Sequence, residues 1–480
     1  MAYKFGKDIY SQLTEALSKI DDLIKTICNL ETTVKDLSKS LIKKDELIEK
    51  QQLEIERLKT KNKKDSSNSS KPSGTDGFKK VITNRREKSD LKQGGQSGHE
   101  FYSLNEDKVQ RLISKGAEVE IINVNKTDKN KDKRYHTVKV IDIEVKMVVK
   151  EYRYYPDESG NYDISVNNIQ NIVYGNNIKA LSSVLNNAFP NSTDSTTSII
   201  SFLTDDEINL SKGTIVNWSE ELADKLQPEI SNIESELLSS HHLNNDECGV
   251  KIDGENYNVI NSSNSTHTRQ WISRYKKHED LEAIDFLTKY LGIIVKDGTD
   301  IYNGFGTGFS QCNSHILRYT KGIYDFVEHQ GPKDMKDFLI RCENERQSLK
   351  LKDVNSFDEI RLAELLNEYN TIIKSWKQEW MADKFNPVYD DERKLLSRME
   401  DSDKEQILYF LHDFKIPFTN NRAEADQRPI KIKQKIGKFR SEAGAENYVA
   451  IRSCISTYKK NKINVFEALA NAFASNPVII

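Results

Sequence analysis

Three acidic side chains are of the type and spacing that could hold divalent metal ions. Asp246 lies in a predicted strand, Asp297 follows the short apolar run GIIVK, and Glu424 lies in a later segment that is expected to be helical. Proteins bind Mg²⁺ through a few carboxylates together with waters and substrate phosphates. Three converging carboxylates would therefore suit metal-dependent chemistry on phosphate groups.

A basic cluster without any acidic residue follows the third of these acids. Its first member, Arg428, stands four residues after Glu424. The whole cluster comprises Arg428, Lys431, Lys433, Lys435, Lys438 and Arg440. A carboxylate beside cations that can bind a phosphate backbone is what phosphoryl transfer on DNA requires. These six residues are therefore candidates for DNA contacts.

Two other aspartates compete for the first two positions. Asp253 follows Asp246 closely, but it belongs to an Asp-Gly pair, which already has a structural reason to exist at a hairpin turn. Asp300 follows Asp297, but it lies past the end of the apolar run. The pattern alone favours Asp246 and Asp297 and leaves the alternatives open.

Glu424 also has a plainer explanation. It stands three residues after Asn421, which is the spacing of a capping box at the start of a helix. With 74 acidic residues in the chain, most carboxylates simply face water. At this point a capping role and a metal-binding role both remain open for Glu424.

The residues from 243 to 297 have an order of elements that would bring the two aspartates together. Strands are predicted at LNNDECGVKID, ENYNVINSS, TRQWISRY and GIIVK, with an Asp-Gly turn between the first two. A helix is predicted between the third and fourth strands, and its apolar face comprises Leu281, Ile284, Leu287 and Leu291. In a ribonuclease H-like sheet the first and fourth strands of this β-β-β-α-β order are neighbours. The expected fold class is therefore mixed α/β with a ribonuclease H-like core, and Asp246 and Asp297 would converge on one edge.

The core is expected to consist of two parts separated by a helical insertion. Residues 241–325 form its first part, 405–450 its second part with the third acid, and 451–480 a C-terminal tail. Between them, residues 326–404 have apolar side chains at helical spacing and predict an insertion. Trp376 and Trp380 are interpreted as packing residues of this insertion, with a wedge into distorted DNA as the alternative.

The N-terminal residues 1–60 carry a heptad repeat. The first seam position has Leu13, Ile20, Ile27, Val34, Leu41, Ile48 and Ile55, and the second has Leu23, Leu30, Leu37 and Leu58. This pattern predicts a coiled coil that assembles a homodimer or higher oligomer through residues 13–58. Lys44 and Gln51 should weaken its later part. The alternative is a helix that packs on its own domain.

Three further segments connect the coiled coil to the core. Residues 61–100 are rich in Lys, Ser and Gly and predict a flexible basic linker. Residues 101–165 contain alternating apolar positions and predict a small β unit. Residues 166–240 are expected to be helical, with a break near Leu210 to Gly213 and a second helix from Thr214. That spacing permits a DNA-binding helix-turn-helix, although such helix pairs also occur in proteins that never touch DNA.

Bulk composition excludes several classes of protein. The formal net charge of −3 gives no overall sign of a nucleic-acid partner, so any DNA surface must come from local clustering. The five cysteines include no CxxC pair, which argues against a disulfide framework and a thiolate zinc site. No apolar run is long enough to span a membrane, and no basic-then-apolar leader is seen. We expect a cytoplasmic, nucleoid-associated protein.

Several blocks of the chain resemble the transposases of the insertion sequence 66 family, which are bacterial DDE enzymes. NNDECGVKIDGENY is similar to the family's Asp-Glu-Thr block, with Cys248 in place of the threonine, and KDGTDIY is similar to its second-aspartate block. TNNRAEADQRPIKIKQKIGKFRSEAGAE with IRSCISTYKKNKINVFEAL resembles the glutamate block and tail. The resemblance selects Asp246, Asp297 and Glu424 as the catalytic and metal-binding residues.

Two further features follow from the resemblance. CNSHILRY is similar to a family stretch, so His315, together with Asn421 beside the glutamate, is expected to support a metal ligand or the substrate. A buried structural histidine is the alternative for His315. Many members also carry a cysteine-rich zinc module, but residues 101–165 contain no cysteine, so no zinc is expected there.

The resemblance implies a function. The chain would be a transposase that uses two Mg²⁺ or Mn²⁺ ions to cleave DNA at the ends of an insertion sequence and to join the freed 3′ ends to target DNA. Its partners would be transposon-end and target DNA, further copies of itself, and small accessory proteins of the same element. No association with a membrane is expected. The alternative is a domesticated, non-catalytic DNA-binding coiled-coil protein. Two other rivals are a nuclease that only hydrolyses and an interaction scaffold.

Overall fold

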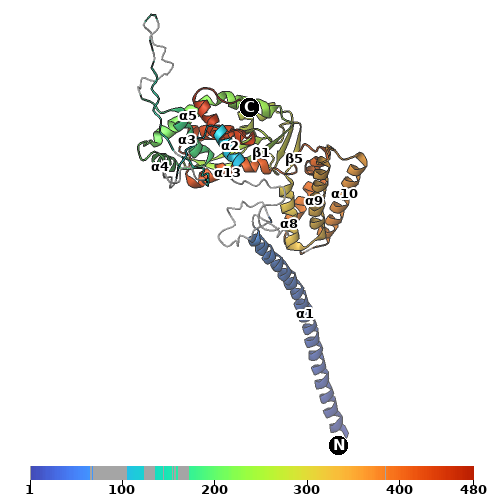
Figure 1. Ribbon diagram of the computed structural model, residues 1–480. Coiled ribbons are helices and arrows are strands. Elements are labelled where there is room, and N and C mark those ends of the chain that lie inside the picture. Colours follow the sequence, from blue (N-terminus) through green and yellow to red (C-terminus); the bar gives the residue numbers. More distant parts are fainter. Residues whose placement is uncertain are drawn as a thin grey trace. The chain divides into compact units, whose positions relative to one another are not determined.

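The computed structural model describes residues 2–64, 68, 105–123, 134, 136–143, 145–153, 155, 158, 159, 172–383 and 385–479 (Figure 1). The chain divides into two units. One comprises Met1–Gly77, Asn176–Ser192 and Val216–Ile480, and the other comprises Phe78–Gly175 and Thr193–Ile215. All of the residues predicted to do chemistry lie in the first unit.

A five-stranded mixed sheet forms the centre of the first unit. Its strands are β1 (His242–Ile252), β2 (Glu255–Ser263), β3 (Thr268–Ser273), β4 (Ile293–Lys296) and β5 (Gly308–Gln311), in the spatial order β3-β2-β1-β4-β5. β1 and β2 are antiparallel, as are β2 and β3, whereas β4 is parallel to both β1 and β5. The four strands predicted from the sequence are present in the predicted order. The arrangement is mixed α/β and consistent with a ribonuclease H-like core.

The hairpin between β1 and β2 is set by its turn. Asp253 and Gly254 both have positive φ, at 48° and 85°. A two-residue hairpin turn of this kind needs left-handed backbone at both central positions, which Asp tolerates and Gly adopts freely. The turn therefore fixes the register in which Asp246 pairs with Asn261 on β2.

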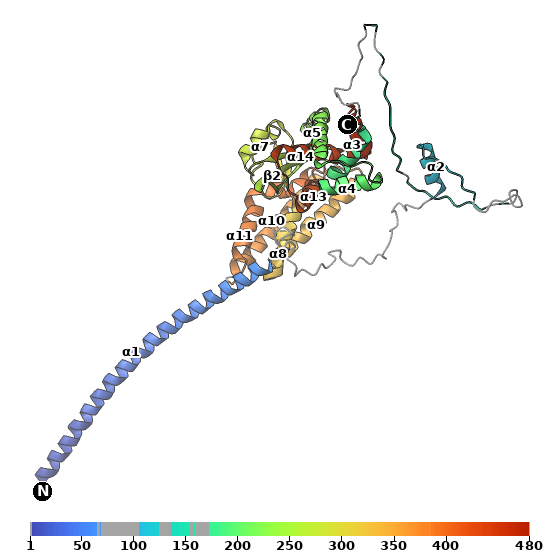
Figure 2. The same ribbon diagram turned by 90° about the vertical axis from the view of Figure 1, so that its left-hand side faces the viewer.

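Two helices from the C-terminal part of the chain pack on β1, β2 and β3. α13 (Asn421–Ile436) contacts β1 and β2, and α14 (Glu442–Lys460) contacts β3 (Figure 2). Their shared core with the strands comprises Cys248, Val250, Ile252, Val259, Ile430, Phe439, Ala445, Tyr448 and Val449. Since side chains alternate along a strand, the even-numbered positions of β1 from 248 to 252 face this core.

The connection from β3 to β4 is less helical than predicted. α7 (His278–Ile284) ends at Asp285, which has a φ of 56°, and only a 3₁₀ turn (Leu287–Lys289) follows. Leu281 and Leu287 are buried, as predicted, but Leu291 is 76% exposed. The left-handed residue breaks the helical periodicity, so Tyr290 takes the buried position that was predicted for Leu291.

Between β5 and α13 the chain forms a group of helices with its own core (Figure 1). They are α8 (Asn313–Val327), α9 (Gln330–Lys350), α10 (Glu359–Ala382), α11 (Tyr389–Ser397), a π-helical turn (Arg398–Ser402) and α12 (Lys404–His412). Trp376 is fully buried, and its indole N–H donates to Glu392 at 2.5 Å. Trp380 stacks against Tyr389. Both tryptophans are therefore packing residues, as interpreted from the sequence.

The N-terminal residues form one long helix, α1 (Ala2–Lys63). Its seam side chains are about half exposed in the single chain, for example Leu30 at 59% and Ile48 at 49%. The helix agrees with the heptad pattern, and its pairing with another helix remains a prediction. No helix in the described part of the chain is both long and apolar enough to cross a membrane.

The remaining helices are α2 (Glu106–Ser114), α3 (Asn176–Ser183), a π-helical turn (Val184–Ala188), α4 (Thr193–Leu203), α5 (Lys212–Lys225), α6 (Gln227–Leu238) and α15 (Val465–Phe473). The predicted helix break falls earlier than expected, between Leu203 and Lys212, and the helix-turn-helix remains a prediction. No strand occurs among the described residues of 115–155, where Val138 and Val140 are exposed. The small β unit thus stays a prediction, and the basic linker lies almost entirely outside the described residues.

Candidate active site

Asp246 lies on β1, and Asp297 directly follows β4, the strand that runs parallel to β1. His242 pairs with Ile293 and Asn244 with Val295, so the same register continued by two residues places Asp246 beside Asp297. Asp246 shares its face of β1 with the buried even-numbered residues that pack on α13. This continued register would bring both aspartates to one edge of the sheet, and their joint role as metal ligands remains a prediction.

The electrostatics of Asp246 show that these acids are close. Burial, followed by the negative charges of Glu247 and Asp297, raises the pKa of the Asp246 carboxyl to about 7, against the opposing charge of Lys431. A like charge disfavours ionisation only over a short distance. The side chain of Asp297 is partly buried, and its Oδ1 accepts a hydrogen bond from the Thr299 amide at 3.2 Å.

Glu424 reaches this region because the start of α13 is tied to β1. The N-cap residue Asn420 is buried, and its side-chain amide donates to the Asn245 carbonyl at 2.6 Å. Its Oδ1 accepts from the Asn244 side chain at 2.9 Å. Asn420 makes no side-chain cap of its helix, and Asn421 is the exposed first helical residue. The capping box considered for Asn421 and Glu424 therefore does not form.

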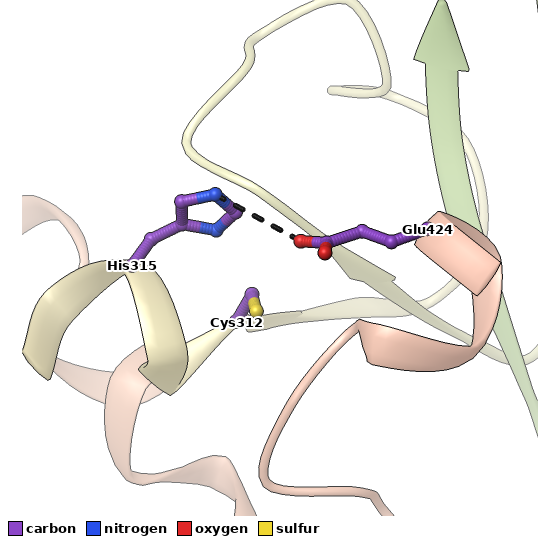
Figure 3. Close-up of side chains that lie close together, drawn as sticks. All are labelled: Cys312, His315 and Glu424. Atoms are coloured by element: carbon purple, nitrogen blue, oxygen red, sulfur yellow. Dashed lines mark ion pairs between the residues drawn. The ribbon is translucent and has the colours of Figure 1, made fainter. Parts of the chain in front are cut away.

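The nearest metal-ligating neighbours of Glu424 come from the beginning of α8 (Figure 3). Its Oε1 lies 4.0 Å from Nε2 of His315. Cys312, His315 and Glu424 each offer one ligand atom, and these atoms lie within 4.8 Å of one another. In the described part of the chain the two aspartates do not join Glu424 in a group this tight. Interaction with Cys312 is the main cause of the raised pKa of His315, and the negative charge of Asp297 adds to it, so Asp297 also lies in the neighbourhood of His315.

Cys312 and His315 affect each other's protonation. Burial alone would raise the pKa of the Cys312 thiol, but His315, the Ser314 hydroxyl and the Asn420 amide together lower it below its usual value. Interaction with the Cys312 sulfur raises the pKa of the His315 imidazole. A negative sulfur beside a positive imidazole is the charge distribution that both shifts favour.

The six basic residues predicted to bind DNA do not form one surface. Arg428, Lys431 and Lys435 are exposed and follow Glu424 at intervals of three or four residues, so they share its face of α13. Lys433 lies on the packed face instead, where its ammonium donates to the Asn191 carbonyl at 2.9 Å and lies over the Tyr448 ring. Lys438 and Arg440 are exposed beyond the helix end.

A comparison with protein families assigns the chain. The family model described as the transposase IS66 family matches residues 195–447, more than half of the chain. The chain belongs to the IS66 family of transposases. The matched range includes Asp246, Asp297, Glu424 and the whole basic cluster. Membership indicates a DNA-processing enzyme that binds DNA. No curated protein matches the chain.

This IS66 family transposase has supporting residues near the acids that the sequence patterns did not single out. Glu247 faces away from α13 and is almost fully buried, where it pairs with Lys276 and accepts a hydrogen bond from the Tyr302 hydroxyl at 2.7 Å. The negative charges of Asp297 and Asp246 also raise the pKa of Lys276. Tyr302 and Glu247 lie within the resembling blocks, whereas no pattern pointed to Lys276.

Another such residue comes from the helical insertion. The Arg398 guanidinium donates to Gln311 and Asp403, at 3.1 and 2.6 Å, and lies so near the Gly298 backbone that a Cβ there would be 2.8 Å from it. A side chain at position 298, directly beside Asp297, would therefore require the Arg398 guanidinium to shift. Of the competing acids, Asp253 lies in the hairpin turn and Asp300 is exposed and accepts a hydrogen bond from Asn303.

The donor set in this IS66 family transposase suits divalent metal ions. Asp246 and Asp297 present carboxylate oxygens, which are the ligands that Mg²⁺ and Mn²⁺ prefer. After burial, the negative charges of Glu247 and Asp297 are the causes that raise the pKa of Asp246, against the opposing charge of Lys431. A divalent cation would relieve that repulsion, so the residues present fit the metal that DDE enzymes use.

Proposed function

We propose that this chain is a catalytically active DDE transposase, in which Asp246, Asp297 and Glu424 hold two Mg²⁺ or Mn²⁺ ions for DNA cleavage and strand transfer. The observation that carries the proposal is the parallel register of β1 and β4, which, continued past its last pair Asn244–Val295, brings Asp246 beside Asp297. The tether from Asn420 to β1 supports the assignment of the third acid. Bound ions of this kind polarise the scissile phosphate and lower the pKa of an attacking water or hydroxyl.

The chain's own residues supply position and charge. The two aspartates would present their oxygens from the edge of the sheet, Asp246 on β1 and Asp297 directly after β4. Pairing of Glu247 with Lys276 and Tyr302 keeps that neighbouring carboxylate on the opposite face, so it does not compete with Asp246 for the ions. The exposed cations on the Glu424 face of α13 would bind backbone phosphates and orient the scissile bond.

Substitution of each acid by its amide tests the proposal. Asp246→Asn, Asp297→Asn and Glu424→Gln are each expected to reduce Mg²⁺-dependent cleavage of DNA carrying the element's ends by at least about 10³-fold, because each removes a metal ligand. Binding of the same DNA, measured by fluorescence anisotropy, should change little. Asp253→Asn, at the hairpin turn, is the matched control and should retain full activity.

The products separate the rival functions. Joined target and donor strands identify a transposase, whereas cleavage without joining identifies a nuclease. If all three amide variants cleave and join as well as the wild type does, the assignment of the acids is wrong. A wild-type chain that binds DNA but shows no metal-dependent cleavage supports the domesticated, non-catalytic alternative instead.

We also propose that α1 pairs with α1 of a second copy as a coiled coil. The half-exposed seam along α1 supports this, because an apolar stripe of that length is unfavourable in water. Leu30→Asp should lower the oligomer mass measured by light scattering, while Lys35→Asp, outside the seam, should not. Unchanged mass in Leu30→Asp contradicts the pairing. Small proteins of the same element are proposed as further partners, in the bacterial cytoplasm on the nucleoid.

A further inference from the structure

A mixed set of metal-ligating side chains faces Glu424 from the start of α8. Cys312 is the N-cap residue of α8, His315 lies in its first turn, and Glu424 lies near the start of α13. One ligand atom of each lies within 4.8 Å of the others. Figure 3 shows the imidazole and the carboxylate directed toward each other, with the thiol group beside them.

The surrounding backbone holds the thiol in place. Cys312 is 1% exposed, and its amide donates to the Lys296 carbonyl at 2.8 Å, at the end of β4. Its sulfur accepts a hydrogen bond from the Asn420 amide at 3.1 Å and lies 2.9 Å from the Ser314 hydroxyl. Donors of this kind, together with the N-terminus of a helix, stabilise a thiolate, which is the form of cysteine that binds metals.

The His315 imidazole faces both of the other donors. Its Nδ1 is buried and makes no hydrogen bond of good geometry with the described residues, although interaction with the Cys312 side chain raises the pKa of the imidazole. An imidazole can bind a metal ion through either Nδ1 or Nε2. The 4.0 Å between Nε2 and the Glu424 carboxylate is too long for a hydrogen bond.

That separation suits two ligands of one ion better. In a tetrahedral zinc site, bond lengths of about 2.0 to 2.3 Å put neighbouring ligand atoms about 3.3 to 3.8 Å apart. The three donors, which lie within 4.8 Å of one another, therefore need to approach by about 1.5 Å or less to bind one ion, through rotation of the His315 and Glu424 side chains. Both side chains are only partly buried.

We propose that Cys312, His315 and Glu424 form a binding site for a divalent ion of the zinc type. A thiolate, an imidazole and a carboxylate together favour Zn²⁺ or Co²⁺ over Mg²⁺, which takes oxygen ligands almost exclusively. Three protein ligands leave a fourth position open to water or to a DNA phosphate oxygen. Such a site lies outside the region of the N-terminal zinc module and shares only Glu424 with the acids assigned to Mg²⁺.

The shared glutamate predicts competition between the two kinds of ion. A zinc ion on Cys312 and His315 would draw the third carboxylate away from the aspartates, so Zn²⁺ should inhibit DNA cleavage in Mg²⁺. This consequence rests on the proposed function, whereas the binding of zinc does not. Cys312→Ser should require about tenfold or more Zn²⁺ for the same inhibition, because the thiolate ligand is lost.

Cobalt absorption tests the site without reference to activity. The full-length protein, freed of metal with a chelator, is titrated with Co²⁺, and we expect about one equivalent to give the near-ultraviolet band of a cobalt thiolate. Cys312→Ser should abolish the band. Cys342→Ser is the matched control, because that buried thiol lies in the core of the helical insertion, and it should leave the band intact.

Two further variants keep the test valid if Cys312→Ser fails to fold by circular dichroism. His315→Gln and Glu424→Gln retain the thiol, and each should weaken Co²⁺ and Zn²⁺ binding by more than about tenfold. A wild-type protein without the band, or unchanged affinity in both variants, overturns the site. An inactive protein that shows the band contradicts only the proposed function, and an active protein without it contradicts only this site.

Discussion

Replacing Asp246 with Asn is expected to stabilise the metal-free protein while it abolishes cleavage. The pKa of this carboxyl rises from 3.8 to about 7 on folding. A shift of about three pKa units corresponds to a folding cost of about 4 kcal/mol for the ionised group. Partial solvent contact and the polarity of the replacing amide reduce the expected gain to about 2 kcal/mol.

The sign of the effect sets its dependence on pH. An acid whose pKa is raised in the folded state does not lower the stability of the fold below its unfolded pKa of about 4, where it is protonated in both states. The loss of stability grows as the pH rises and reaches its full size above pH 7. The stability difference between Asp246→Asn and wild type should therefore be largest at pH 8 and less than about half as large at pH 5. Urea unfolding in the presence of EDTA at the two pH values measures it.

Two further comparisons make this prediction refutable. Asp253→Asn removes the same charge in the exposed hairpin turn, where Asn also accepts a positive φ, so its stability should match the wild type. Added Mg²⁺ should reduce the difference in stability between Asp246→Asn and the wild type, because an ion that binds the folded wild type stabilises it. A gain in stability that is absent at pH 8, or equal at pH 5 and pH 8, would show that folding does not raise the pKa of Asp246.

Three other outcomes follow from contacts away from the acids. Burial, aided by nearby positive charge, lowers the pKa of His242 to about 4, so folding favours the neutral imidazole. The free energy of unfolding should therefore fall by up to about 3 kcal/mol as the pH drops from 6.5 to 4. His242→Gln should reduce this dependence on pH in urea titrations. Asp426→Asn should lower the free energy of unfolding by about 3 to 5 kcal/mol in the same assay, because it leaves the buried Lys460 ammonium without its negatively charged partner. A second substitution, Lys460→Met, should recover much of that loss of stability. Lys435→Ala should reduce the salt dependence of DNA binding by about one unit of slope, whereas Lys433→Ala should leave that slope unchanged and lower stability instead.

The strand order and the pair of aspartates could be predicted because local patterns determine them. An Asp-Gly turn fixes the β1–β2 register, and the apolar run before Asp297 ends at the sheet edge. Side-chain alternation then decides which face each acid occupies. The end of α7 could not be predicted in this way, because a left-handed residue at Asp285 interrupts an otherwise suitable apolar spacing.

The surroundings of Glu424 were beyond sequence patterns for a different reason. The expectation of no zinc rested on the absence of cysteine pairs, but the structure brings together one Cys, one His and one Glu from two helix starts. Nothing in the basic cluster distinguishes Lys433 from Lys435, because only the packing of α13 on its neighbours decides which face is exposed. Lys276 meets Glu247 through the sheet, at a sequence distance that no local motif covers.

The helical insertion separates the aspartates from Glu424 along the chain, and this affects the order in which the site is made. During synthesis, both aspartates and every helix of the insertion leave the ribosome before α13 does. A nascent chain therefore lacks the third of the proposed metal ligands until translation is nearly finished. A chain that stops before residue 421 keeps α1 and both aspartates but lacks the third acid. If α1 pairs as proposed, such a fragment should silence each full-length partner that it joins, and its co-expression should suppress transposition.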